Sequence, residues 1–187
     1  MPFYFVCAIM FLNITDEVKA MNDKTRMEIY NKAFEYEKNF GGCAQCTLCS
    51  LQTYLDINSA VIKSATALMA GGVRSGNSCG AFNGALMAIS AVCGREYDNM
   101  GDKQAVADTL VLGRKLHDRF MQEYGSVICR DIQYRIMGKS YRMYDPEDMA
   151  RFLADGGHDD KCTAVVANAA VWAAEILEEM GIVKFDL

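Results

Sequence analysis

The chain has 187 residues, of which 51% are hydrophobic, and its formal net charge at pH 7 is −5. This apolar content supports a packed core and excludes a disordered chain, and the length is typical of one domain. The acidic balance, without a stripe of Lys and Arg, excludes nucleic acid as an expected partner. Because there are only two prolines and few β-branched runs, we expect an all-α fold, a single-domain helical bundle of about seven helices.

An apolar extension is predicted at residues 1–14, ahead of a helical domain at residues 15–187. The run from Phe3 to Leu12 is too short to span a bilayer. It has no basic residues before it and no small-residue cleavage site after it, so an extension is favoured over a targeting segment, which stays open. We therefore expect no membrane span and a cytoplasmic protein.

Capping residues and glycine pairs divide the first half of the chain into predicted helices. Thr15, followed by two acidic residues, can cap the first helix, and Gly41-Gly42 ends it. Asn58-Ser59 can cap the third helix, and Gly71-Gly72 ends it. The helices are expected at residues 15–39, 43–55, 58–71 and 79–93.

The helix predicted at residues 79–93 has two faces of different composition. Its apolar face carries, at spacings of three and four residues, Cys79, Phe82, Leu86, Ile89 and Cys93. Its second face carries only the small residues Gly80, Gly84, Ala88 and Ala91. A glycine inside a helix costs about 1 kcal/mol relative to alanine. Two glycines one turn apart therefore predict the close approach of another backbone or of a bulky cofactor.

Further helices are predicted in the second half of the chain. Asp145-Pro146 is typical of a helix start, since an N-cap residue is followed by proline at the first helical position. Helices are expected at residues 102–124, from residue 129, and at residues 145–154 and 160–180. The last helix has an inward stripe of Cys162, Val166, Ala169, Ala173, Ile176 and Met180. Cys79 and Cys162 both fall in register with a core stripe, so they should face the interior.

Four of the eight cysteines lie where a predicted helix begins, namely Cys43, Cys79, Cys129 and Cys162. The first turn of a helix has free backbone N–H groups and a partial positive charge. A thiol there should ionise more easily, and the thiolate is both the nucleophile and the metal ligand. If these four helix starts converge, they form a site made of thiolates.

Several chemistries suit such a set of cysteines. Four thiolates fit tetrahedral zinc or an iron–sulfur cluster, and a pair of them could cycle between dithiol and disulfide. Each could also be a small buried hydrophobic residue. Cys46 has CxxC spacing with Cys43, which makes it a candidate auxiliary or resolving thiol. In a helical chain of this size that lacks a convincing signal peptide, reduced thiols in the cytoplasm are favoured over disulfides.

One histidine lies close to this set along the chain. His158 follows Gly156-Gly157 and precedes Cys162 by four residues. It could supply a metal ligand or a proton, but a solvated histidine is the more common case, and we expect His158 to be solvated.

The cysteine segments resemble the redox-active protein family named for its pattern, C_GCAxxG_C_C. The resemblance runs from about Tyr30 to Met180. Its central signature is matched by Ser78-Cys79-Gly80-Ala81-Phe82-Asn83-Gly84. The other segments are Gly42-Cys43-Ala44-Gln45, Tyr124-Gly125-Ser126 ahead of Cys129, and Cys162 with the alanine-rich stretch behind it.

The resemblance implies a small redox-active or metal-cluster protein. A related region in split-Soret-type cytochromes is associated with an iron–sulfur centre, but this chain has no Cys-x-x-Cys-His haem attachment site. We hypothesise an iron–sulfur cluster for electron transfer, of the two-iron type, with all four helix-start cysteines as redox thiols and metal ligands. Gly80, Ala81 and Gly84 would adjoin the cluster, leaving room for it and directing N–H groups to its sulfurs. Its absence from an aerobic preparation would be compatible with this hypothesis.

Two further functions stay open at this point. One is a metal-free dithiol oxidoreductase, pairing Cys43 with Cys46, or Cys79 with another of the four cysteines. The other is a structural module stapled by zinc, which is less favoured because zinc modules usually bring their ligands in closely spaced pairs. The electron donor or acceptor stays unidentified, and a homodimer is left open.

Overall fold

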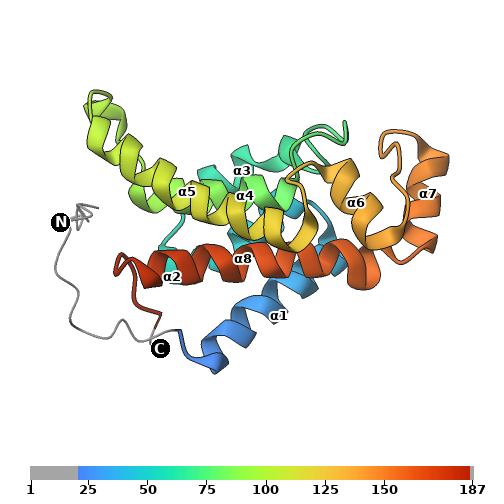
Figure 1. Cartoon of the computed structure of the whole chain (residues 1–187), viewed down its shortest axis with the longest axis horizontal. Helices are drawn as coiled ribbons and strands as arrows, with labels where there is room; N and C mark the ends of the chain where they lie inside the picture. Colours follow the sequence, from blue (N-terminus) through green and yellow to red (C-terminus); the bar gives the residue numbers. More distant parts are fainter. Residues whose placement is uncertain (1–20, 186–187) are drawn as a thin grey trace.

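The computed structural model describes residues 21–185, and these form a bundle of α-helices (Figure 1). The expected all-α, single-domain bundle is confirmed: the described residues contain eight α-helices and no strand. Their only extended pairing is one antiparallel bridge, between Ser78 and Ile128. The helices are α1 Asp23–Phe40, α2 Cys43–Leu55, α3 Ser59–Ser64, α4 Gly80–Cys93, α5 Lys103–Tyr124, α6 Cys129–Met137, α7 Pro146–Ala154 and α8 Cys162–Glu179.

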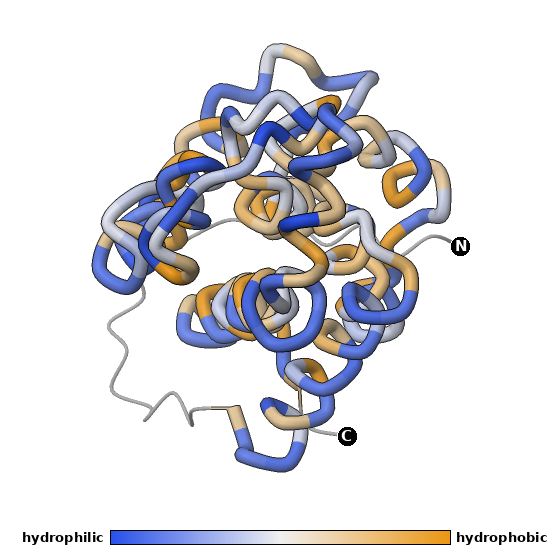
Figure 2. The backbone as a smooth tube through the Cα atoms, turned by 90° about the vertical axis from the view of Figure 1, so that its right-hand side faces the viewer, coloured by the Kyte–Doolittle hydropathy of each residue, from blue (hydrophilic) through white to orange (hydrophobic). Residues whose placement is uncertain are grey.

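Helix α8 is the centre of the bundle, and α1, α2, α4 and α5 pack against it (Figure 1). Its sequence is rich in alanine, and the fully buried small residues include Ala167, Ala169, Ala170, Ala173 and Ala174. A helix that is apolar on most of its faces can be buried on most of its faces. Hydrophobic and hydrophilic residues alternate along the backbone at short intervals (Figure 2), as amphipathic helices around a core require.

The close approach predicted for the helix at residues 79–93 is an approach of α4 to α2. A Cβ atom at Gly84 would lie 2.5 Å from the carbonyl oxygen of Ala44 and 2.9 Å from its Cα, so only glycine fits. A Cβ at Gly80 would collide with the Sγ atom of Cys43. The space beside both glycines is therefore taken by α2 and by a thiol, and it is not left open as room for a cofactor. Ala91 is exposed, so the small-residue contact ends before it.

Three predicted helix boundaries are wrong. Helix α1 begins at Asp23, since Asn22 is extended and its side chain accepts a hydrogen bond from the N–H of Thr25 at 2.9 Å. The proposed cap at Thr15 and the extension at residues 1–14 lie outside the described residues. Helix α3 is short and is followed by a separate 3-10 turn at Thr66–Leu68. A π-helical turn at Gly157–Lys161 precedes α8, which therefore begins at Cys162 rather than at Asp160.

The segment of residues 138–161, which we call the cap, stands apart from the main bundle. It contains α7, at the right-hand end of Figure 1, and the π-helical turn. Its interior is a separate cluster of three buried side chains, Tyr141, Met143 and Phe152. Within residues 21–185, no helix has both the length and the hydrophobicity that a membrane crossing needs.

Candidate functional site

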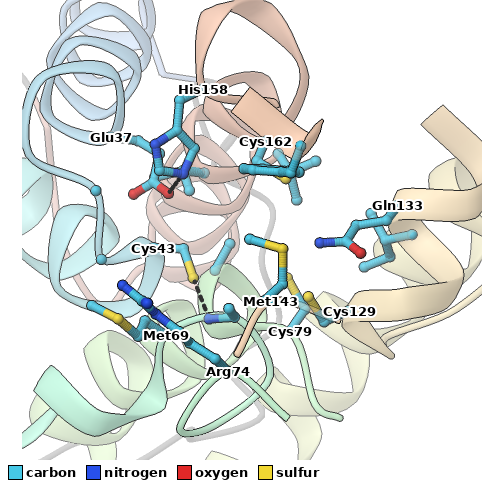
Figure 3. Close-up of a pocket in the computed structure, with 18 of the residues that line it drawn as sticks. Glu37, Cys43, Met69, Arg74, Cys79, Cys129, Gln133, Met143, His158 and Cys162 are labelled. Atoms are coloured by element: carbon cyan, nitrogen blue, oxygen red, sulfur yellow. Dashed lines mark hydrogen bonds and ion pairs between the residues drawn. The ribbon is translucent and has the colours of Figure 1, made fainter. Parts of the chain in front are cut away.

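All four helix-start cysteines line one cavity of about 280 Å³ (Figure 3). Cys43 and Cys162 are the first residues of α2 and α8, Cys129 is the first residue of α6, and Cys79 is the N-cap of α4. The sequence reasoning placed these residues at helix starts without knowing whether the starts meet. The fold brings them together from four separate elements.

The chain segments that carry Cys79 and Cys129 are joined to each other by backbone hydrogen bonds. The N–H of Cys79 donates to the carbonyl of Val127 at 2.9 Å, and the N–H of Cys129 donates to the carbonyl of Asn77 at 2.6 Å. These bonds flank the isolated antiparallel bridge, so the entries into α4 and α6 are clamped to each other. Nothing in the spacing of these cysteines predicted this pairing, since it joins loops about fifty residues apart in the chain.

Cys43 lies beside a loop of unusual backbone conformation. Five consecutive residues, Ala70–Arg74, have positive φ angles of 48°, 84°, 77°, 44° and 61°. Three of them are not glycine, and the β-branched Val73 is especially disfavoured in this region. The loop directs the N–H of Ala70 to the Sγ atom of Cys43 at 3.4 Å and brings Arg74 to the cavity wall.

Burial keeps the four thiols protonated in this structure. It raises the pKa of Cys79 and of Cys129 to about 12, and it raises the pKa of Cys43 and of Cys162 well above the ordinary value. The pKa of each of the four is also raised by at least one other cysteine of the set, which places all of them within electrostatic reach of one another.

Backbone N–H groups oppose this shift without overcoming it. The N–H groups of Ala81 and Phe82 lower the pKa of the Cys79 thiol, and those of Ala70 and Ala44 lower that of Cys43. The predicted easier ionisation at helix starts is therefore wrong for the protein alone, because removal from water outweighs the helix termini. The N–H of Ala81, which also lines the cavity, reaches the Cys79 thiol, and the predicted contact of such groups with the sulfurs of a cluster stays a prediction.

The four thiols are not arranged around a single metal ion in this structure. Among residues 21–185, no three His, Cys, Asp or Glu side chains lie close enough together to hold one ion. A zinc ion draws its thiolates to about 2.3 Å from itself. Here the four thiols instead surround a cavity, and they would lose their protons on binding metal.

Sequence reasoning missed a buried carboxyl group in the cavity wall. Glu37 is 2% exposed, its Oε1 atom lies 3.5 Å from Nε2 of His158, and its Oε2 atom has no hydrogen-bond partner. Burial raises the pKa of Glu37 from its ordinary value of 4.5 to about 8, against a smaller lowering by Cys46. A signal was present, because Thr25, Ile29, Ala33 and Glu37 share one buried face of α1 at spacings of four.

His158 is partly buried, with 26% of its side chain exposed, whereas the sequence-based expectation was a solvated residue. It lines the cavity, and its ring packs edge-on against Phe152 with the ring centroids 5.3 Å apart. Burial lowers the pKa of His158. With the opposite shift at Glu37, the two side chains form a neutral pair at pH 7, one carboxyl group and one unprotonated imidazole.

The first segment contributes one thiol to the cavity, that of Cys43. The Cys46 thiol points elsewhere, donating to the carbonyl of Gly41 at 3.1 Å, and burial raises its pKa, with a further increase from Glu37. Cys49 is partly buried and lies outside the cavity wall. Cys46, the residue predicted as an auxiliary thiol, is therefore near the site without facing the cavity.

Comparison with known proteins gives one match. Residues 42–176 match a family model described as "Putative redox-active protein (C_GCAxxG_C_C)". No curated protein and no solved structure matches the chain. The matched region covers more than half of the chain and contains all four cavity cysteines.

Proposed function

The chain belongs to the C_GCAxxG_C_C family of redox-active proteins, and from this premise we propose that Cys43, Cys79, Cys129 and Cys162 bind an iron–sulfur cluster for electron transfer. The observation that carries the proposal is that these four thiols, from four separate helix starts, line one cavity. Four cysteine thiolates are the ligand set of two-iron and four-iron clusters, and we propose the two-iron type. When bound, such a cluster supplies one-electron transfer.

The surroundings of the thiols support charge on sulfur once metal has displaced their protons. The N–H groups of Ala70, Ala81 and Phe82 reach the sulfurs of Cys43 and Cys79. Hydrogen bonds to cluster sulfurs are one of the means by which proteins set a reduction potential. These backbone groups would therefore hold the ligand charge in place and raise the potential.

The remaining wall limits water. Several apolar side chains line the cavity, among them Met69, Ile132, Met143, Met149 and Phe152. A dry, weakly polar wall lowers the local dielectric around the thiolates, which affects potential and slows loss of a bound group. The cap supplies three of these five residues, so we infer that it shields the site.

The test is metal analysis after anaerobic purification. The proposal predicts a coloured protein with iron and acid-labile sulfide in equal amounts, about two of each per chain for the two-iron type. Cys43→Ser should lose most of both. Cys49→Ser is the matched control, because Cys49 lies on the same helix but outside the cavity wall, and it should keep both. A colourless protein without iron would refute the cluster, and one zinc per chain would favour the structural module.

A second candidate is favoured by the backbone clamp between Cys79 and Cys129. Two thiols whose chain segments are joined in this way can form a disulfide, passing two electrons and two protons to an oxidant such as a disulfide of another protein. Mass spectrometry after oxidation, with and without a reductant, detects that bond. If no reversible disulfide joins Cys79 to Cys129 in the metal-free protein, this candidate is wrong.

A further inference from the structure

The cavity carries positive charge in a chain that is acidic overall. Lys38 and Arg74 both line it, and neither side chain makes an ion pair or a hydrogen bond with the described residues. Glu37 is the only carboxylic side chain in the wall. Since it holds its proton at neutral pH, it does not oppose an anion there.

Arg74 is held at this wall by a backbone that resists relaxation. Its φ angle is 61°, at the end of the left-handed run from Ala70. Non-glycine residues in this region cost on the order of 1–3 kcal/mol each, and they persist where the surroundings enforce them. Figure 3 shows the Arg74 side chain lying beside Cys43 and Met69, on the same side of the cavity as Glu37. The strain thus places an unpaired guanidinium beside the thiols.

An unpartnered acceptor lies deeper in the same cavity. The Oε2 atom of Glu37 is buried and has no hydrogen-bond partner. Leaving a buried polar atom unsatisfied costs about 1–3 kcal/mol. A hydroxyl or amine of a bound molecule would satisfy this atom, and neither Lys38 nor Arg74 does so in the structure.

We propose that the cavity binds a small carboxylate-bearing molecule, with its carboxylate on Arg74 and a hydroxyl or amino group donating to Glu37. A guanidinium can hold a carboxylate through two parallel N–H bonds, which gives both affinity and orientation. Such a ligand would lie against Cys43. The site requires no cluster, so this inference goes beyond the function proposed above.

The test uses three matched probes, lactate, propionate and propane-1,2-diol, titrated calorimetrically into the anaerobically purified protein. Lactate carries both groups, propionate lacks the hydroxyl, and the diol lacks the charge. Lactate should bind most tightly, propionate more weakly, and the diol not at all. Arg74→Gln should weaken both anions about tenfold or more. Arg114→Gln is the control, because Arg114 is exposed on α5 and lies outside the cavity wall, and it should change neither.

A second variant tests the inner contact. Glu37→Met removes the acceptor while keeping a side chain of similar length, and circular dichroism verifies that it folds. It should abolish the advantage of lactate over propionate and leave propionate binding unchanged. The proposal is overturned if neither anion binds, or if Arg74→Gln binds them as the unaltered chain does. If Arg74→Gln only reduces iron content and no anion binds, Arg74 merely balances the charge of a cluster. Iron content is measured separately, so either idea can fail alone.

Discussion

The main bundle and the cap meet at the cysteine cavity, and they are stabilised in different ways. The bundle has an extended core in which Ile89, Leu112, Leu116 and Phe120 are fully buried. The cap has three buried side chains of its own. Cys79 belongs to the bundle core and Cys43 packs against it, whereas Cys162 packs against the cap cluster. The wall of the site that the bundle supplies is therefore part of a large core, whereas the wall that the cap supplies is stabilised by a small cluster.

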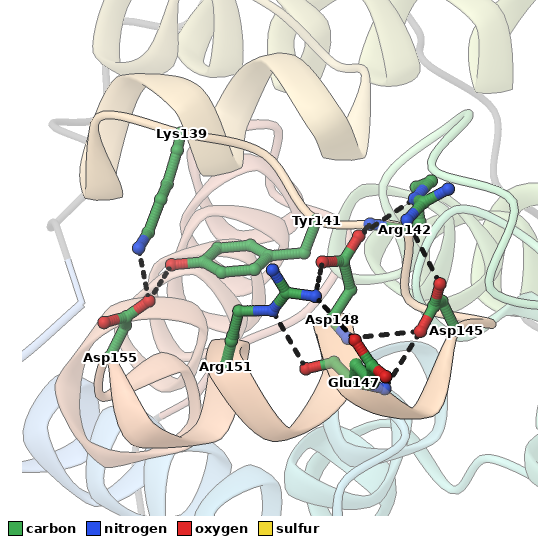
Figure 4. Close-up of polar contacts among 8 residues, drawn as sticks. All are labelled: Lys139, Tyr141, Arg142, Asp145, Glu147, Asp148, Arg151 and Asp155. Atoms are coloured by element: carbon green, nitrogen blue, oxygen red, sulfur yellow. Dashed lines mark hydrogen bonds and ion pairs between the residues drawn. The ribbon is translucent and has the colours of Figure 1, made fainter.

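The surface of the cap carries a network of ion pairs (Figure 4). Arg142 pairs with Asp145 and Asp148, and Arg151 pairs with Asp148 and Glu147. The side chains of both arginines are more than half exposed, at 64% and 58%. Exposed pairs contribute about 0–1 kcal/mol each. Access to the thiols is therefore controlled by the cap, which is the less stable of the two regions.

The largest expected effect is that of Phe152→Ala. Phe152 is 1% exposed, and its ring contacts Tyr141, Gly157 and His158. Its truncation should lower the free energy of unfolding of the cap by about 3–5 kcal/mol. Hydrogen exchange should accelerate in α7 with little change in α8, and alkylation of Cys162 should become faster. Leu153→Ala, at an exposed neighbour, is the control. Uniform acceleration across the bundle would show that the two regions unfold as one.

The next effect belongs to the bundle. Gly84→Ala should lower the free energy of unfolding of the chain by about 1–3 kcal/mol, because the new Cβ would meet the backbone of Ala44. Gly113→Ala is a matched helical control, since its Cβ would meet only the flexible end of Leu86 at 3.1 Å. It should be neutral or stabilising by up to about 1 kcal/mol from helix propensity. Equal thermal stabilities for the two variants would contradict the tight α2–α4 contact.

Leucine substitutions on the small-residue face of α4 should separate Gly84 from Ala91. Gly84→Leu should damage both folding and thiol geometry, and Ala91→Leu should affect neither, because Ala91 is exposed. Thermal unfolding and thiol alkylation measure the two effects. If Gly84→Leu stays folded with unchanged thiol reactivity, the glycine contact does not position Cys43.

A pH effect comes from the boundary between the two regions. Burial raises the pKa of Glu37 from 4.5 to about 8 in the folded chain. The contribution of the Glu37 proton to the free energy of unfolding is therefore complete below pH 4.5. It is lost as pH rises through about 8, by at most about 1.4 kcal/mol per pH unit. Glu37→Gln should remove this slope from urea unfolding, and Glu35→Gln, exposed on the same helix, should keep it. An unchanged slope in Glu37→Gln would mean that Glu37 is ionised in the folded chain.

The smallest effect is expected at the cap surface. Arg151→Gln breaks its pairs with Glu147 and Asp148 and should cost about 0.5 kcal/mol or less. The loss should shrink further in high salt, as measured by exchange in α7. A cost above about 2 kcal/mol would show that the charges, and not Phe152, hold the cap.

Local signals predicted the elements, and distant contacts determined the site. Asn58 and Asp145 cap their helices as expected, and the four cysteines begin theirs, because capping and periodicity act within a few residues. The clamp between the loops before Cys79 and Cys129 has no local signal. Likewise, the electrostatic prediction for the thiols was wrong because burial depends on residues far away in the chain.

Two features of the cavity had partial signals. The four-residue spacing from Ile29 to Glu37 indicates a buried position for this carboxyl group. A single glutamate in a charged segment nevertheless predicts a surface position, because its contact with His158 is not visible in the sequence. The glycines at 71 and 72 indicated a loop. The left-handed conformation of Val73 and Arg74 is imposed by the loop's hydrogen bonds, which sequence propensity opposes.

The most direct test of the central claim compares iron and sulfide in the anaerobically purified chain and in Cys162→Ser, the variant in which the cap-side cysteine is removed. Cluster binding across both regions predicts equal iron and sulfide in the unaltered chain and a large loss in Cys162→Ser, with helical content preserved. No iron in the unaltered chain, or an undiminished content in Cys162→Ser, would contradict a site built from all four cysteines.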